Sequence, residues 1–231
     1  MYKYVLFDLD GTLTDSKDGI INSVAYALEK MGESTEGRLD QHTVVGPPLL
    51  TTFEEVYGFS PEKARRTYAY FQERYSTIGK FENRAFDGIV PMLKTMKEAG
   101  IRSFVATSKP QVHAEAICQK FGIAPYVEAI AGPAVGGTDT KADVMRRILD
   151  GLGPLQPGDA VMVGDRRFDV IGAHELGLPV IYVTYGYGNE AERKAFQPEY
   201  TADTVAALGQ LLLQASQAHH IHYIYDKEHF L

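Results

Sequence analysis

Short runs of apolar residues recur along the chain, at residues 4–9, 101–106, 160–163 and 180–183. Each run is only a few residues long, is rich in Val, Ile, Phe and Tyr, and is bounded by Gly, Asp, Thr or Pro. Continuous apolar runs of this length are typical of strands that are buried on both faces of a parallel sheet. They predict four strands, and a weaker run at residues 126–131 is a fifth candidate.

Segments with a helical period separate these runs. Residues 88–99, 110–121 and 140–152 carry apolar side chains at intervals of three and four, which is the spacing of one face of a helix. Strands that alternate with helices in this way predict an α/β fold, a doubly wound parallel sheet with helices on both faces.

Residues 15–85 follow a different pattern, because no buried strand interrupts a series of predicted helices. These helices lie at about residues 19–31, 48–57 and 61–78. An insertion of this size after the first strand predicts an all-helical domain over the carboxyl edge of the sheet. We therefore expect one discontinuous core domain, residues 1–14 and 86–231, and a helical cap domain, residues 15–85.

The composition is that of a globular protein, since 45% of the 231 residues are hydrophobic and 23% are charged. A chain of this length can bury one core and a second, smaller one. The formal net charge of −7 gives no broad basic surface, so we expect no nucleic acid partner. No uncharged apolar run approaches the roughly 18 residues needed to span a bilayer, so we expect no membrane contact and a cytoplasmic location.

The single cysteine, Cys118, allows no intramolecular disulfide, and we interpret it as a packed core thiol. Four of the seven histidines, His219, His220, His222 and His229, lie close to the C-terminus. They lack a firm ligand spacing, so the tail is expected to pack on the core or on a second subunit rather than to bind a metal. A monomer and a homodimer both remain open.

Two acidic residues follow the first predicted strand, in the sequence Asp8-Leu9-Asp10-Gly11-Thr12. Strand periodicity places Asp8 and Asp10 on the same side at the carboxyl edge of the sheet, where ligands bind in open α/β folds. Two carboxylates this close repel each other, so a cation or a shared proton must stabilise them. A simple turn would explain one aspartate and the glycine, but not two acids in register after a buried strand.

The strand predicted at residues 160–163 is followed by a second acidic pair, Asp165 and Asp169. Asp169 lies four residues after Asp165 and could share its face on the following helix, although a plain helix cap would also explain it. Four carboxylates at the ends of two strands would form an oxygen-rich site that suits Mg²⁺.

Thr107, Ser108 and Lys109 follow the second main strand, at the point where a helix is predicted to begin. Hydroxyl groups and free backbone N–H groups at a helix N-terminus suit phosphate oxygens, but Thr and Ser also cap helices without any ligand. Lys141 begins the next predicted helix, where its charge opposes the helix dipole. Each signal is weak alone, and a solvated surface side chain would explain Lys141.

Together these residues resemble the four signature motifs of the haloacid dehalogenase superfamily, in order and with suitable separation. The motifs are Asp8-Leu9-Asp10-Gly11-Thr12, Thr107, Lys141, and Gly164-Asp165 with Asp169. The resemblance covers residues 1–210, and the helical insert resembles the type 1 cap of that superfamily. Residues 46–49, 106–110, 164–169 and 185–188 make the chain most similar to its phosphoglycolate phosphatase-like enzymes, especially a 5'-nucleotidase-like branch.

The resemblance implies a Mg²⁺-dependent phosphatase that works in two steps. Asp8 would attack phosphorus and form an aspartyl-phosphate, while Asp10 would protonate the leaving alkoxide and later take a proton from the hydrolytic water. The metal-binding residues implied are Asp8, Asp10 through its backbone carbonyl, Asp165 and Asp169. The phosphoryl oxygens would be held by Thr107, Ser108 and Lys141. Lys109 could contact the phosphate or only a neighbouring carbonyl, and Arg166 could contact substrate or pair with an acid.

A cap of this size must open and close over the site, so the expected substrate is a small phosphate monoester. Phosphoglycolate and nucleoside 5'-monophosphates are the two leading candidates. A sugar phosphomutase of the same superfamily keeps both Asp8 and Asp10, and a non-catalytic phosphate-binding module is a further alternative. A dehalogenase and a phosphonate-cleaving enzyme are disfavoured, since neither needs a second acid at Asp10.

Overall fold

The computed structural model describes residues 2–213, so the histidine-rich tail lies outside the described residues. Six strands form the main sheet in the order β5-β4-β1-β6-β7-β8, and each neighbouring pair is parallel. The strands are β1 (Tyr4–Phe7), β4 (Arg102–Ala106), β5 (Ala129–Ala131), β6 (Ala160–Gly164), β7 (Val180–Val183) and β8 (Tyr200–Ala202). The five strands predicted from the apolar runs are all present.

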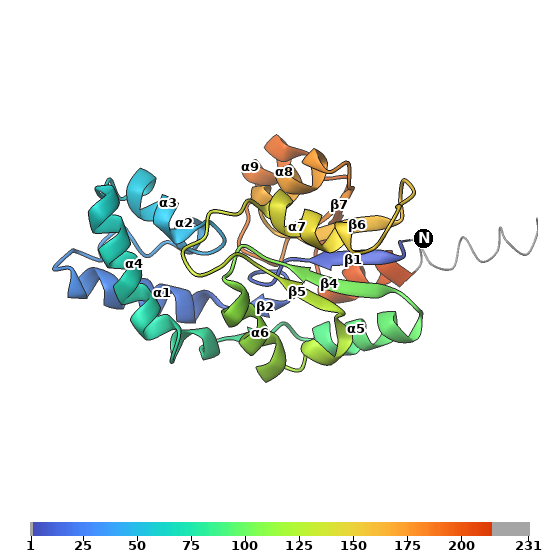
Figure 1. The fold of residues 1–231 in the computed structure, drawn as a ribbon, viewed down its shortest axis with the longest axis horizontal. Coiled ribbons are helices and arrows are strands. Elements are labelled where there is room, and N and C mark those ends of the chain that lie inside the picture. Colours follow the sequence, from blue (N-terminus) through green and yellow to red (C-terminus); the bar gives the residue numbers. More distant parts are fainter. Residues whose placement is uncertain (1, 214–231) are drawn as a thin grey trace, which may run out of the picture.

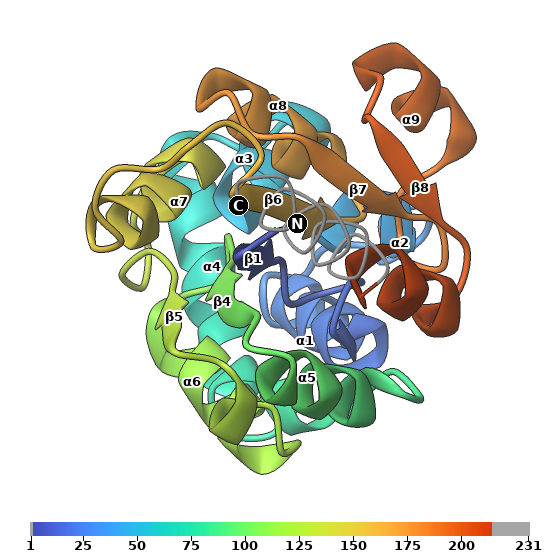
Figure 2. The same cartoon turned by 90° about the vertical axis from the view of Figure 1, so that its right-hand side faces the viewer.

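Helices cover both faces of the sheet, which confirms the doubly wound α/β fold (Figure 2). On one face lie α5 (Ile89–Glu98), α6 (Gln111–Lys120) and a helix at residues 205–213, and on the other lie α7 (Lys141–Asp150) and α8 (Arg167–Glu175). The cause is the alternation of side chains along each strand. In β1, Val5 and Phe7 pack with the first set of helices and Leu6 with the second.

A second hydrophobic core holds together the helical segment inserted after β1. Its helices are α1 (Lys17–Lys30), α2 (Gln41–Val44), α3 (Leu49–Thr51) and α4 (Pro61–Tyr75), with a π-helical turn at Thr52–Val56 and a 3-10 turn at Gly79–Phe81. A short antiparallel ribbon of β2 (Thr14–Asp15) and β3 (Arg84–Ala85) joins the segment to the sheet. The division into core and cap domains stays a prediction, and the separate core and the ribbon support it.

The insert lies beyond the carboxyl ends of the strands (Figure 1). Strand β1 runs from the N-terminus toward helices α1 to α4, so the loops that follow β1, β4 and β6 face the insert. The space between this edge of the sheet and the helical insert is therefore where the acidic motifs meet.

Elements without an apolar pattern were not predicted. Strand β8 is an edge strand in which only Ala202 is buried, and α9 (Glu190–Phe196) buries no residue at all. The helix predicted at residues 48–57 is present, but as α3 followed by the π-helical turn. Cys118 is fully buried on α6, so its interpretation as a core thiol is confirmed. Within residues 2–213, no helix combines the length and apolarity needed to cross a membrane.

Candidate active site

The loop after β1 brings Asp8 and Asp10 to the carboxyl edge of the sheet. It is a tight loop, in which the backbone N–H of Gly11 donates to the Thr14 carbonyl over 2.8 Å. Gly11 has a φ of 79°, and a Cβ at this position would overlap the carboxylate of Asp165. Glycine therefore permits both the backbone turn and the close approach of this loop to the end of β6.

Asp8 is buried, and one of its carboxylate oxygens is firmly held. Oδ1 accepts a hydrogen bond of 2.8 Å from the Leu9 backbone and lies 2.8 Å from Nζ of Lys141. No donor from the described residues reaches Oδ2, so that oxygen is free to meet phosphorus or a metal ion. Burial raises the pKa of Asp8 to about 6, although Lys141 opposes this change. The neighbouring ammonium of Lys141 favours the ionised carboxylate that a nucleophile must be.

Lys141 is a buried cation between two carboxylates, not a solvated surface residue. Its Nζ lies 2.8 Å from Asp8 and 2.9 Å from Asp169, and it donates to the carbonyl of Ala106 over 3.2 Å. A capping box of Thr140 with Asp143 begins α7 and fixes where Lys141 enters the site. Burial lowers the pKa of Lys141, but the carboxylates of Asp169 and Asp8 outweigh it and raise that pKa above its ordinary value.

Asp165 and Asp169 are both fully buried after β6. Asp169 accepts a hydrogen bond of 3.1 Å from the Arg166 backbone at the start of α8, so it caps the helix and also faces Lys141. Asp165 accepts from the Tyr187 backbone over 2.6 Å and from the Thr12 hydroxyl over 3.4 Å. Burial raises the pKa of Asp165 well above its usual range, and the charges of Asp169 and Asp8 add to the rise.

The donor set at this point fits a divalent cation. Carboxylate oxygens from Asp8, Asp165 and Asp169 lie within 4.8 Å of one another, and all three residues are buried. Hard oxygen ligands in this number suit Mg²⁺, and a cation would offset the charge that raises the pKa of Asp165. The Asp10 carboxylate does not belong to this cluster because it pairs with Lys109 at 2.9 Å. Binding through the Asp10 backbone carbonyl stays a prediction.

The loop after β4 places Thr107, Ser108 and Lys109 on the wall of the same pocket. The hydroxyl of Thr107 accepts a hydrogen bond of 3.1 Å from the Lys109 backbone, which holds the loop in shape. The Lys109 side chain donates to no neighbouring carbonyl among the described residues, and its contact with the phosphate stays a prediction. It pairs instead with Asp10 and donates to the hydroxyl of Tyr75 from helix α4.

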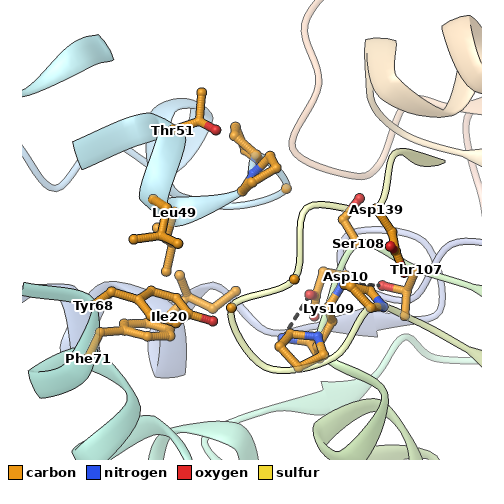
Figure 3. A pocket seen from close by; sticks show the side chains of 18 of the residues that line it. Asp10, Ile20, Leu49, Thr51, Tyr68, Phe71, Thr107, Ser108, Lys109 and Asp139 are labelled. Atoms are coloured by element: carbon orange, nitrogen blue, oxygen red, sulfur yellow. Dashed lines mark hydrogen bonds and ion pairs between the residues drawn. The ribbon is translucent and has the colours of Figure 1, made fainter. Parts of the chain in front are cut away.

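A cavity of about 220 Å³ lies between the sheet edge and the insert. Figure 3 shows that Asp10, Lys109 and Thr107 gather at one end, while Ile20, Tyr68 and Phe71 line the other. The polar end is made by loops of the core, and the apolar end by helices α1 and α4 of the insert. The cavity can therefore hold a polar group beside Asp8 and an apolar group beneath the insert.

Tyr187 is a supporting residue whose role the sequence did not reveal. Its backbone N–H donates to Asp165, and its hydroxyl donates to Asp15 over 2.9 Å at the start of the insert. A Cβ at the preceding Gly186 would overlap Asp165. The sequence Tyr-Gly-Tyr-Gly at residues 185–188 could have indicated this role, because glycines allow the loop to pass close to the buried side chain of Asp165.

The sequence left two alternatives for Arg166, contact with the substrate or pairing with an acidic side chain, and the structure shows a pairing with an acid. Its guanidinium lies 3.3 Å from Glu192 on α9 and donates to the carbonyls of His42 and Val45 in the insert. A Cβ at Gly46 would press against this guanidinium, so the turn at residues 46–48 is shaped around it. Arg166 thus connects the loop after β6 to the insert.

Residues 5–183 match the model of one protein family, the haloacid dehalogenase-like hydrolases. A 5'-nucleotidase of Pseudomonas aeruginosa is 41% identical, over 91% of this chain and 96% of its own length. A tyrosine-protein kinase, PtkA of Mycobacterium tuberculosis, is 44% identical over 80% of this chain, which spans 62% of that longer protein. The crystal structure of a predicted phosphatase from Clostridium acetobutylicum superposes with a TM-score of 0.87 at 42% identity, covering 93% of this chain and 99% of that one.

Proposed function

The chain belongs to the haloacid dehalogenase-like hydrolase family and is a phosphatase, and we propose that it hydrolyses nucleoside 5'-monophosphates through an aspartyl-phosphate on Asp8 with the help of Mg²⁺. The observation that carries this proposal is the state of Asp8. One of its oxygens is held by two donors, no donor among residues 2–213 reaches the other, and the residue lines a cavity that is large enough for a small ester.

In the first step Asp8 Oδ2 forms a bond to phosphorus as the bond from phosphorus to the ester oxygen breaks. Lys141, fixed between Asp8 and Asp169, stabilises the negative charge on Asp8 and on the phosphoryl oxygens. Thr107 and Ser108 line the cavity beside Asp8 and donate to the same oxygens. When bound by Asp8, Asp165 and Asp169, Mg²⁺ supplies positive charge that offsets the repulsion between carboxylate and phosphate.

Asp10 transfers the protons in both steps. Its carboxyl group gives a proton to the departing ester oxygen, and the resulting carboxylate takes one from the water that hydrolyses the aspartyl-phosphate. The position of Asp10 supports this assignment, because it lines the cavity next to Asp8 while its carboxylate stays outside the acidic cluster.

The apolar end of the cavity, opposite Asp10, supports a nucleoside as the leaving group. Ile20, Leu49, Tyr68 and Phe71 present aliphatic and aromatic surface there, and a flat uncharged base can pack on it. Stacking of a base on an aromatic side chain is worth about 1–3 kcal/mol. The 5'-nucleotidase of Pseudomonas aeruginosa, similar along nearly its whole length, supports the same substrate class.

Phosphoglycolate fits this wall less well. Its carboxylate needs a cation, and among the described residues that line the cavity Lys109 alone is cationic. That ammonium already pairs with Asp10. A carboxylate buried without a partner costs several kcal/mol, which outweighs what the small glycolate group gains by burial.

The test is phosphate release from a panel of nucleoside 5'-monophosphates, phosphoglycolate and sugar phosphates, with Mg²⁺ and with a chelator. Asp8→Asn is the matched control, since it keeps the shape of the side chain and removes the nucleophile. We expect Mg²⁺-dependent release that is fastest for a nucleoside monophosphate and is lost in the control.

Other outcomes would point to the alternatives. Phosphate that returns to the sugar rather than to water would identify a phosphomutase. A folded protein that binds Mg²⁺ and releases phosphate from none of the esters would identify a non-catalytic module.

A further inference from the structure

We propose that Lys109 and Tyr75 are positioning residues for the carboxyl group of Asp10, so that helix α4 of the insert completes the proton-transfer part of the site. This inference rests on the proposed function, in which Asp10 protonates the leaving oxygen. Neither Lys109 nor Tyr75 needs to touch the reacting phosphoryl group for this purpose.

The pairing of Lys109 with Asp10 orients the carboxyl group. Nζ lies 2.9 Å from Oδ2 of Asp10, and the two side chains are only 4% and 10% exposed. The other oxygen of Asp10, Oδ1, is buried without a hydrogen-bond partner among the described residues, although Asp10 lines the cavity. The lysine therefore holds one oxygen in place, and no donor among the described residues competes for the second one.

Tyr75 holds Lys109 from the opposite side. It ends helix α4, is buried, and accepts a hydrogen bond from Nζ through its hydroxyl oxygen. The same Nζ lies 4.5 Å from the centre of the Tyr75 ring, which adds a cation–π contact. The ring is fixed in turn, because it stacks on Phe71 at 5.0 Å and meets the edge of His113 at 5.4 Å.

These contacts connect helix α4 of the insert to Asp10 through Lys109. Tyr75 belongs to the insert, whereas Lys109 and Asp10 belong to loops that follow β4 and β1 of the core. If α4 moves away from the sheet, Lys109 loses its phenol partner and its position. Asp10 then loses the contact that holds its carboxyl group in position, so proton transfer is efficient only with α4 in place.

The chemistry of the first step offers a specific readout. As Asp8 bonds to phosphorus, the electron pair of the breaking bond goes to the ester oxygen, which takes the proton from Asp10. A nucleoside alkoxide is a poor leaving group and needs that proton, whereas 4-nitrophenolate leaves readily without it. A defect in the position of Asp10 therefore slows the reaction of the nucleoside monophosphate and leaves the reaction of 4-nitrophenyl phosphate nearly unchanged.

The experiment compares kcat/KM for a nucleoside 5'-monophosphate and for 4-nitrophenyl phosphate, in the wild type, Tyr75→Phe and Lys109→Met. The ratio kcat/KM reports the steps up to phosphorylation of Asp8 and is not affected by hydrolysis of the intermediate. Because general acid catalysis contributes about 10²–10⁴-fold, we expect a loss of about 100-fold for the nucleotide in Lys109→Met and about 10-fold in Tyr75→Phe. For 4-nitrophenyl phosphate both losses should stay within about threefold.

Tyr26→Phe is the matched control for Tyr75→Phe. Tyr26 on α1 is half-buried and also donates its hydroxyl to a side chain of helix α4, that of Glu73, but neither Tyr26 nor Glu73 lines the cavity. The Tyr26→Phe variant should have the same kcat/KM as the wild type with both esters. Thermal unfolding of each variant shows whether it is folded, and the conservative Tyr75→Phe keeps the test valid if Lys109→Met does not fold.

Equal losses on the two esters would overturn the inference, because they would mean that Lys109 binds the phosphoryl group or only supports the fold. Unchanged rates in both variants would overturn it as well. Failure of the proposed function gives a different result, in which the wild type itself releases no phosphate from either ester.

Discussion

The ammonium of Lys141 lies 2.8 Å from the carboxylate of Asp8, and both side chains are buried. Lys141 comes from the first turn of α7 and Asp8 from the loop after β1, so the pair joins two parts of the chain that are far apart in sequence. In the described part of the chain, no other ammonium or guanidinium contacts Asp8 or Asp169. The acidic cluster therefore depends on this lysine.

Lys141→Met should be both inactive and unstable. Removing one partner of a buried ion pair costs about 3–5 kcal/mol, because the remaining charge stays buried and unpaired. Phosphate release should fall by at least about 100-fold, since the charge on Asp8 and on the phosphoryl group is no longer offset. Urea unfolding in a chelator measures the first effect, and added Mg²⁺ should restore part of the lost stability.

Lys194→Met is the control for that variant. Lys194 pairs with Glu190 at 2.7 Å, but the two side chains are 69% and 66% exposed. An exposed pair contributes at most about 1 kcal/mol, so this variant should unfold almost as the wild type does. An equal decrease in the free energy of unfolding for Lys141→Met and Lys194→Met would contradict the importance we assign to the buried pair.

Gly11→Ala should damage the metal site through the close approach of Gly11 to Asp165. Gly11 and Gly32 both have a positive φ, 79° and 69°, but a Cβ at Gly32 would meet no other atom within 4 Å. Gly32→Ala therefore measures backbone strain alone, about 1–2 kcal/mol. Gly11→Ala should cost about 1–3 kcal/mol more because of overpacking. Isothermal titration with Mg²⁺ should show weaker binding in Gly11→Ala and unchanged binding in Gly32→Ala.

His113 should make stability fall in mild acid. Burial lowers the pKa of His113 to about 4, and the charges of Lys109 and Lys80 add to this effect. The unfolded chain takes up a proton near pH 6.5 while the folded protein does not, so the free energy of unfolding decreases as the pH falls from about 6.5 toward 4.

His113→Gln should make this pH dependence smaller, because glutamine does not titrate and can still bond to Gln72. The imidazole lies 2.9 Å from the side-chain oxygen of Gln72 on α4. Denaturant unfolding at pH 7.5 and pH 5.5 measures the difference for each protein. The exposed His174 provides the control, His174→Gln. An unchanged difference in His113→Gln would show that the decrease arises elsewhere.

Leu49→Arg should shift the preference among substrates. Leu49 begins α3 on the apolar wall of the cavity, where a guanidinium could meet the carboxylate of phosphoglycolate. We expect the ratio of kcat/KM for phosphoglycolate to that for a nucleoside monophosphate to rise by at least about tenfold, the effect of 1.4 kcal/mol. Leu49→Met keeps the wall apolar and should leave the ratio unchanged. A fixed ratio in Leu49→Arg would mean that the wall does not select the substrate.

The sequence alone predicted the sheet and the acids at its edge. Parallel strands with both faces buried need continuous apolar runs, and those runs placed β1, β4, β6 and β7 and therefore the loops that follow them. The positions of Asp8, Asp10, Asp165 and Asp169 followed from that arrangement. Strand β8 and helix α9 could not be predicted, since neither buries an apolar stripe.

Only the tertiary structure decided how each charged side chain is used. A lysine at a helix start has the same local sequence whether it is solvated or buried, and contact with Asp8 and Asp169 makes Lys141 a buried cation. Lys109 contacts both Asp10 and Tyr75, and Tyr75 lies on a helix 34 residues earlier in the chain. Local periodicity determines which face of an element is apolar, whereas ion pairs between distant segments depend on how the insert packs against the sheet.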